Sequence, residues 1–268
     1  MRRVALGVQY DGRGWSGWQS QSSGNTIQDV LESALARFAD EPIRTHAAGR
    51  TDAGVHATAQ VVHFDTVRER PLGGWVRGVN RYLPPSVAVR WACLVDPTFH
   101  ARFSAVSRTY HYVLYCHPVR APHMVGRAGW SFRALDVSLI VEAAKVLEGE
   151  HDFSAFRSVE CQAKSPIKVL HALDVQDHGD FLLFHLHASA FLHHMVRNII
   201  GSLITVGRGS EPVSWLEEVL ASRQRALASP TFMADGLYLT KVEYPSEFSL
   251  PASDGIEAAF PGFGKGTP

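Results

Sequence analysis

Hydrophobic and polar positions follow two regular spacings along the chain, one typical of strands and one typical of helices. Val4 to Tyr10 reads as a strand. Thr26-Ile27-Gln28-Asp29 resembles a capping box, with Asp in place of the usual Glu or Gln, and predicts the start of a helix with an apolar stripe ending at Phe38. Further elements are predicted as strands at Ile43 to Ala48, Ala59 to Phe64 and Val87 to Leu94, and a helix at Leu72 to Leu83.

The second half of the chain repeats this order of strands and helices. Strands are predicted at Thr109 to Tyr115, Val169 to Gln176, Phe181 to Ala188 and Leu237 to Tyr244, and helices at Val137 to Leu147 and Phe191 to Val206. Two similar α+β units are therefore expected, with an active site in the cleft where they meet.

The predicted domains are residues 1–104 and 105–245. Residues 246–268 are rich in Gly, Pro and small side chains, and they are expected to form a flexible tail.

Composition points to an ordinary globular protein, with 46% hydrophobic and 19% charged residues among 268. The formal net charge is zero, so nucleic-acid binding would require segregated charge. The sequence contains no run of roughly eighteen apolar residues and no apolar signal core at its start. We therefore expect a cytoplasmic protein with no membrane partner.

The segment GRTDAGVHA, from Gly49 to Ala57, places two glycines, an arginine, an aspartate and a histidine between two predicted strands. Glycine permits backbone angles closed to other residues, which can direct Asp52 toward a ligand. The alternative is a polar turn in which Asp52 caps a helical turn or pairs with Arg50.

Arg197 stands in the middle of the otherwise apolar segment predicted as a buried helix from Phe191 to Val206. A buried, unpaired guanidinium costs about 3–5 kcal/mol, so a carboxylate should reach it. Asp52 is one candidate partner, and the pairing would keep it ionised as a nucleophile or base. A structural ion pair, or an Arg197 that extends to solvent, remains an alternative.

Tyr110 and Tyr112 lie on one face of a predicted strand. Aromatic pairs on strands usually belong to the core, but exposed ones can stack on an unstacked base. Core packing is the interpretation favoured for Tyr112, and Tyr110 is left open.

Metal and cofactor chemistry finds little support in the motifs. The chain has fourteen histidines, but His193 and His194 are adjacent, and His185 and His187 alternate on a strand without a nearby acidic or cysteine ligand. HExxH, P-loop, GxGxxG and GxSxG motifs are absent from the sequence. We expect no metal and no cofactor.

Taken together, several segments resemble the tRNA pseudouridine synthase A family. They are YDGRGWSGWQSQ, TIQDVLE, AGRTDAGVHA, FHARFSAVSRTYHY, GEHDFSAFR, CQAKSP and FLHHMVRNIIG. The resemblance extends over all of the chain except the tail, and the pairing of AGRTDAGVHA with MVRNIIG is specific to that family.

The resemblance implies an α+β pseudouridine synthase fold of two similar domains, with mixed, mainly antiparallel sheets meeting at a central cleft. It implies a homodimer that binds the anticodon stem-loop of tRNA and isomerises uridines 38, 39 and 40 to pseudouridine. Position by position, the nucleophile is Asp52, the active-site tyrosine is Tyr110, and the arginine paired to the aspartate is Arg197. Arg50 corresponds to an arginine that helps to extrude the base or fills its place.

Two other functions are weighed against this one. A non-catalytic RNA-binding protein could use the same scaffold. A nucleoside or glycoside hydrolase would need a pair of carboxylates, whereas the motif loop carries one. Candidates for phosphate contacts are Arg2, Arg3, Arg77, Arg102, Lys164 and Lys168.

Overall fold

The computed structural model describes residues 1–263, which form two compact units. The first unit contains Met1–Val106 and the chain from Tyr238 onward, and the second is Ser107–Leu237. The boundary between the units falls two residues after the predicted one. The strand at the end of the second half, counted in the predicted second domain, belongs to the first unit, where it pairs in parallel with another strand.

The first unit is built on strands in the order β4-β1-β3-β10. β1 pairs antiparallel with both β3 and β4, while β10 runs parallel to β3, so the sheet is mixed. The bounds are β1 (Arg2–Tyr10), β2 (His46–Ala47, paired with β3), β3 (His56–Thr66), β4 (Val87–Val95) and β10 (Leu237–Glu243).

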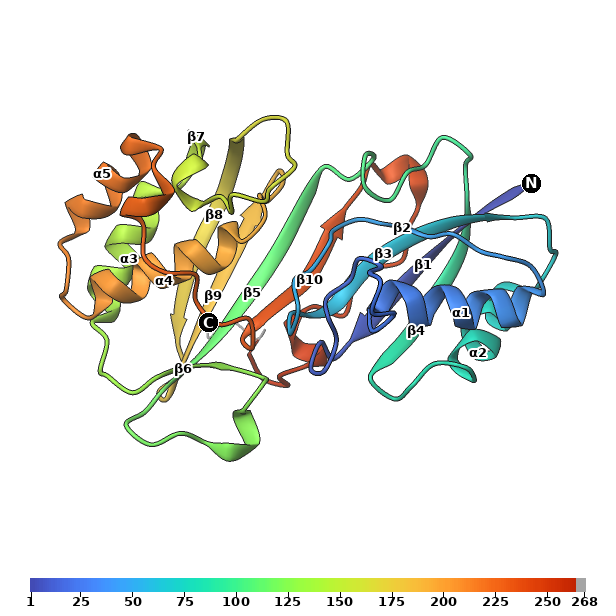
Figure 1. Cartoon of the computed structure of the whole chain (residues 1–268), viewed down its shortest axis with the longest axis horizontal. Helices are drawn as coiled ribbons and strands as arrows, with labels where there is room; N and C mark the ends of the chain where they lie inside the picture. Colours follow the sequence, from blue (N-terminus) through green and yellow to red (C-terminus); the bar gives the residue numbers. More distant parts are fainter. Residues whose placement is uncertain (264–268) are drawn as a thin grey trace. The chain divides into compact units, whose positions relative to one another are not determined.

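Two helices, α1 (Ile27–Ala39) and α2 (Leu72–Asn80), pack beside the strands of this unit (Figure 1). The predicted cap of α1 is confirmed, since the Thr26 side chain accepts a hydrogen bond from the Asp29 backbone N–H at 3.2 Å. Buried Trp75 of α2 packs edge-on against Phe64 of β3, with ring centroids 5.0 Å apart.

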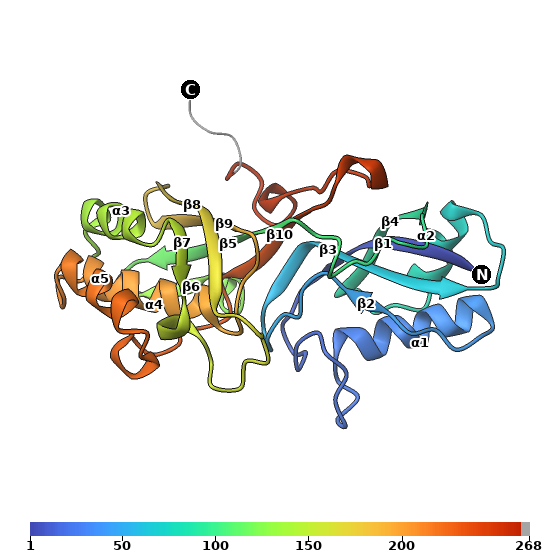
Figure 2. The same ribbon diagram turned by 90° about the horizontal axis from the view of Figure 1, so that it is seen from above.

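The segment after β10 covers the other face of the same strands, opposite α1 (Figure 2). It contains two short 3₁₀ helices, Ser246–Phe248 and Ile256–Ala258. Phe248 packs on Phe99 at 5.1 Å, and Ile256 is 2% exposed. Phe248 and Ile256, in the segment predicted to be a tail, therefore bury apolar surface against the first unit. Residues 264–268 of that tail lie outside the described residues.

The second unit has the strand order β5-β9-β8-β7, antiparallel throughout, with β6 added parallel to β5. Its helices lie together beside the strands (Figure 1). The strands are β5 (Ser107–Cys116), β6 (Gly129–Ser131), β7 (Gly149–Asp152), β8 (Ile167–Asp177) and β9 (Phe181–Ala188), and the helices are α3 (Val137–Val146), α4 (Met195–Gly207) and α5 (Val213–Ser222).

The α+β fold class predicted from the sequence is confirmed, but two elements were placed wrongly. The helix predicted from Phe191 begins at Met195, because His194 has a left-handed backbone with φ of 64° and ends the preceding turn. The strand predicted over Ile43 to Ala48 is reduced to the two residues of β2. Among the described residues, no helix is long and apolar enough to cross a bilayer.

Candidate active site

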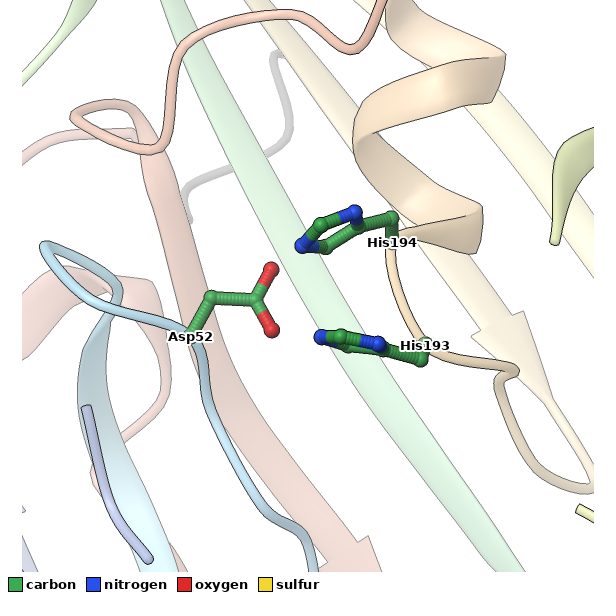
Figure 3. Close-up of side chains that lie close together, drawn as sticks. All are labelled: Asp52, His193 and His194. Atoms are coloured by element: carbon green, nitrogen blue, oxygen red, sulfur yellow. The ribbon is translucent and has the colours of Figure 1, made fainter. Parts of the chain in front are cut away.

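Asp52 lies on the loop that leads into β3 and is half-buried. The loop closes on itself through the Val55 backbone N–H, which donates to the Asp52 carbonyl at 3.2 Å. Gly54 between them has φ of +80°, a conformation that side chains other than glycine rarely adopt. Figure 3 shows the Asp52 carboxylate projecting from this loop.

The residue before Asp52 is anchored in the core of the first unit. Thr51 is 7% exposed, and its hydroxyl bonds the Tyr10 hydroxyl at 2.8 Å. The Thr51 carbonyl accepts from the Trp18 backbone N–H at 2.9 Å. A Cβ on Gly17 would lie 2.7 Å from that carbonyl, so only glycine fits there. The backbone at Asp52 is therefore held from two directions.

Buried Gln60 fixes the start of the same loop. Its side-chain amide donates to the Gly49 carbonyl at 2.7 Å and accepts from the Gly49 N–H at 3.3 Å. It also donates to the Tyr10 hydroxyl at 3.3 Å, and burial raises the pKa of Tyr10 to about 12. The Tyr10 hydroxyl therefore stays protonated at neutral pH and works as a structural bridge. Gln60 is a polar residue within an apolar strand sequence, and that was the one signal that could have identified it.

Arg50 is exposed on this loop, two residues before Asp52. Where the loop ends, the ring of His56 stacks on Tyr238 of β10 at 4.5 Å, and its Nδ1 accepts from the Gly12 N–H at 3.1 Å. These contacts hold the end of the loop that presents Asp52 and Arg50, as Gln60 holds its start. The sequence pattern included His56 among the polar residues of the loop without a role, and it did not single out Tyr238.

Tyr110 and Tyr112 lie on β5 in the second unit. Tyr112 is fully buried, and its hydroxyl donates to the Met233 carbonyl at 3.0 Å, which confirms the interpretation of Tyr112 as a core residue. Tyr110, 8% exposed, packs edge-on against Phe191 with centroids 5.1 Å apart. Its ring is thus positioned by packing rather than free on the surface.

Arg197 is the third residue of α4, not the middle of a helix as expected. It is half-buried, and its Nε donates to the Phe232 carbonyl at 2.8 Å. The Phe232 N–H donates in return to the Arg197 carbonyl at 3.3 Å. This exchange fixes the guanidinium at its Nε, and a guanidinium is a donor group suited to carboxylates. The N-terminal end of a helix also favours anions.

We call residues 228–233 the strap, because this segment joins α4 to β5 through the contacts of Phe232 and Met233. A buried network holds it, centred on Asn198, which is 0% exposed. The Asn198 Oδ1 accepts from the Thr231 hydroxyl at 2.7 Å and from Arg225 Nη2 at 3.1 Å. A Cβ on Gly201 would lie 2.6 Å from the Pro230 carbonyl, so the helix and the strap are in close contact.

His193 and His194 precede α4, with ring centroids 4.0 Å apart (Figure 3). Within either unit, the described residues include no group of three His, Cys, Asp or Glu side chains close enough to share an ion.

Two of the candidates for phosphate contacts, Arg2 and Arg3, form ion pairs with carboxylates of the first unit. Arg3 makes a two-pronged ion pair with Asp65, at 2.8 Å for each bond, and also donates to the Phe99 carbonyl. This pairing raises the pKa of Arg3 and commits its guanidinium to the fold. Arg2 pairs with Glu69 at the surface.

Comparison with known proteins gives consistent matches along most of the chain. The family model described as tRNA pseudouridine synthase matches residues 7–104 and 143–245. A protein named tRNA pseudouridine synthase A from Herminiimonas arsenicoxydans is 61% identical over 257 residues, 94% of each chain. Proteins of the same name from Paraburkholderia xenovorans and Burkholderia mallei are 58% and 59% identical, each match covering 94% of this chain and 93% of the relative. A solved structure titled "Crystal Structure of a Cbf5-Nop10-Gar1 Complex" is a distant neighbour, with a TM-score of 0.40 and 11% identity. The match covers 88% of this chain and 48% of that chain.

Proposed function

The chain belongs to the tRNA pseudouridine synthase family, and we propose that it converts the uridines at positions 38, 39 and 40 of tRNA into pseudouridine with Asp52 as the nucleophile. It is an isomerase of tRNA uridines with the pseudouridine synthase fold. The observation that carries the finer proposal is the presentation of Asp52. It is the one carboxylate in the loop GRTDAGVHA, whose backbone is fixed by Tyr10, Trp18 and Gln60.

The reaction matches what such a carboxylate can do. Isomerisation detaches uracil from the ribose, turns it over and reattaches it through carbon 5, so nothing is oxidised and no atom is added. A carboxylate that attacks the ribose anomeric carbon, or the uracil ring, forms a covalent intermediate that divides the exchange into two steps. The pocket must also keep water from the freed base. No metal or nucleotide is needed for these steps.

The other residues have roles that suit their settings. Tyr110, held by Phe191, would stack on the uracil and would take part in removing its C5 proton. Arg197, braced by Phe232, would supply the positive charge that keeps the reacting carboxylate ionised and oriented. Arg50 would occupy the space left when the base is flipped out of the stem.

We also propose that the enzyme works in the cytoplasm as a homodimer that binds the anticodon stem-loop, which rests on the family's properties alone. One chain has a mass of 29.5 kDa. Light scattering that gave only this mass in solution would contradict the dimer.

The experiment that tests the proposed function locates the product. A tRNA transcript is incubated with the protein, treated with a carbodiimide that stays attached to pseudouridine, and read by primer extension. We expect primer extension to stop at the modified positions 38 to 40. Transcripts with cytidine at these positions should give no such stops. Modification elsewhere in the tRNA would overturn the assignment of sites, and release of free uracil would indicate a hydrolase instead.

A further inference from the structure

The turn at residues 96–104, between β4 and β5, is held rigidly on the first unit. The His100 N–H donates to the Ser104 hydroxyl, and the Ser104 N–H donates to the His100 carbonyl, both at 2.9 Å. The Ala101 carbonyl accepts from the Tyr244 hydroxyl at 2.6 Å, and Ala101 is 0% exposed. These hydrogen bonds hold the backbone of the turn in one conformation, and so they fix where its side chains leave the backbone.

Phe103 stands on this rigid turn with 76% of its surface exposed. One side of its ring lies against His100, with centroids 4.3 Å apart, and His100 lies against His63 at 4.7 Å. His63 is 2% exposed, so a column of three rings runs from the core to the surface. Its outermost ring has a face open to solvent, a position where a fourth flat ring could stack.

The charge around this column is positive at its outer end. The guanidinium carbon of Arg102 lies 5.6 Å from the centre of the Phe103 ring. Burial lowers the pKa of His100, helped by the nearby charges of His46 and Arg3, and burial lowers that of His63 to about 3. At neutral pH the two inner rings are therefore uncharged, with His100 tilted against Phe103 and edge-on to His63, and the cation at the exposed ring is Arg102.

We propose that Phe103 and Arg102 form a stacking site for an unpaired base of the tRNA, with the base on the open face of Phe103 and Arg102 on a neighbouring phosphate. The site rests on the proposed function for the identity of its RNA. The Phe103 ring contributes little to the stability of the fold, because it buries little of its surface against the protein. Folding therefore does not explain why an aromatic ring stands at this position. An aromatic ring fixed on a rigid turn binds a flat partner with little loss of conformational entropy.

The chemistry of the site suits RNA. The contacts of the ring are an imidazole and a guanidinium, both of which stack on nucleobases. Stacking on an aromatic ring is available to every base, since each base has a π-face. The site should therefore contribute affinity without selecting a sequence.

The test measures tRNA affinity in protein that cannot turn over. Fluorescence anisotropy with a labelled tRNA transcript gives the Kd of Asp52→Ala protein and of the same protein with an added Phe103 substitution. Phe103→Ala and Phe103→Leu should each raise the Kd about 5- to 150-fold, because stacking contributes about 1–3 kcal/mol per base. Phe103→Trp should restore tight binding. Val106→Ala removes a nearby exposed apolar side chain, 55% exposed, and serves as the matched control.

Salt dependence separates the two residues of the site. Phe103→Ala should leave the slope of log Kd against log salt unchanged, whereas Arg102→Gln should reduce it by about 0.7–0.9, the value for one phosphate contact. An unchanged Kd in Phe103→Ala would overturn the stacking site, as would full binding by Phe103→Leu. A loss of dimer mass in Phe103→Ala would show a protein interface instead.

The outcome is independent of the proposed reaction. If protein with Asp52 intact makes no pseudouridine while Phe103→Ala still weakens tRNA binding, the stacking site stands and the reaction proposal fails. If pseudouridine forms normally and Phe103→Ala binds like its parent, the reverse holds.

Discussion

His63 is an uncharged histidine in the core of the first unit. It lies on β3, and its Nδ1 accepts a hydrogen bond from the Ala101 N–H at 3.1 Å. Burial is the main cause that lowers its pKa to about 3, followed by repulsion from His100. In the unfolded chain a histidine has a pKa near 6.5. Protonation therefore occurs more readily in the unfolded state.

This difference predicts that the protein becomes less stable as the pH is lowered. Between about pH 6.5 and the folded pKa near 3, the unfolded state binds more protons, so the free energy of unfolding decreases as the pH decreases. From pH 7 to pH 5 the contribution of His63 is on the order of 1–2 kcal/mol. Urea denaturation of His63→Gln, which retains an acceptor for Ala101, should show a smaller change over this interval than the wild type. His123→Gln, at an exposed position, is the control, and equal changes in all three proteins would contradict the assignment.

At the scale of single residues, the sequence located Asp52 and Arg50 because glycines and a short polar loop between strands are visible in it. The residues that hold that loop were not predictable in the same way. Tyr10 precedes it by about forty positions, and Gln60 lies within the strand that follows. The pairing of β1 with β3 brings Tyr10 to the loop, and the pairing of β2 with β3 brings Gln60 beside Gly49. Hydrogen bonds between distant segments depend on strand register, which no local pattern encodes.

The strap shows how an element of irregular structure can set the position of a functional side chain. It carries the Phe232 carbonyl that bonds Arg197 and the Met233 carbonyl that bonds Tyr112. Its own conformation depends on Asn198, whose side-chain amide also donates to the Phe156 carbonyl at 2.7 Å. Loss of one partner would leave part of a buried polar group unsatisfied.

Thr231→Val is the variant that tests the strap. It keeps the shape of the side chain but removes the hydroxyl that donates to Asn198 and accepts from Arg225. We expect the free energy of unfolding to fall by about 1–3 kcal/mol. We also expect kcat for tRNA to fall by about tenfold for each 1.4 kcal/mol of lost transition-state stabilisation, with little change in KM.

Steady-state kinetics and urea denaturation measure both effects. Thr231→Ser retains the hydroxyl and should behave like the wild type. A Thr231→Val protein that loses stability but keeps its kcat would show that the strap supports the fold without positioning Arg197.

Element prediction succeeded where the periodic pattern was long and failed where one residue decided the boundary. The strand at Phe181–Ala188 was predicted with its observed bounds. The helix carrying Arg197 was predicted to start at Phe191, since its apolar pattern runs on without interruption, but the left-handed backbone of His194 ends the turn before it. Arg197 was therefore expected in a helix interior and lies instead in the first turn.

At the scale of the whole molecule, two α+β units were expected and two compact units are observed, each with helices beside its strands. β10 illustrates why its unit could not be read from sequence order. It follows the second half of the chain but pairs in parallel with β3, placing Tyr238 beside His56 at the end of the Asp52 loop. Sequence order alone does not predict this pairing with a strand of the first half.

The central claim is that the protein isomerises tRNA uridine through Asp52. The most direct measurement is tritium release from tRNA labelled at carbon 5 of uridine, comparing the wild type with Asp52→Ala after both are shown to bind tRNA. Formation of pseudouridine expels the C5 hydrogen, so we predict tritium release by the wild type and none above background by Asp52→Ala. Equal release by the two proteins, or release by neither with tRNA binding intact, would contradict it.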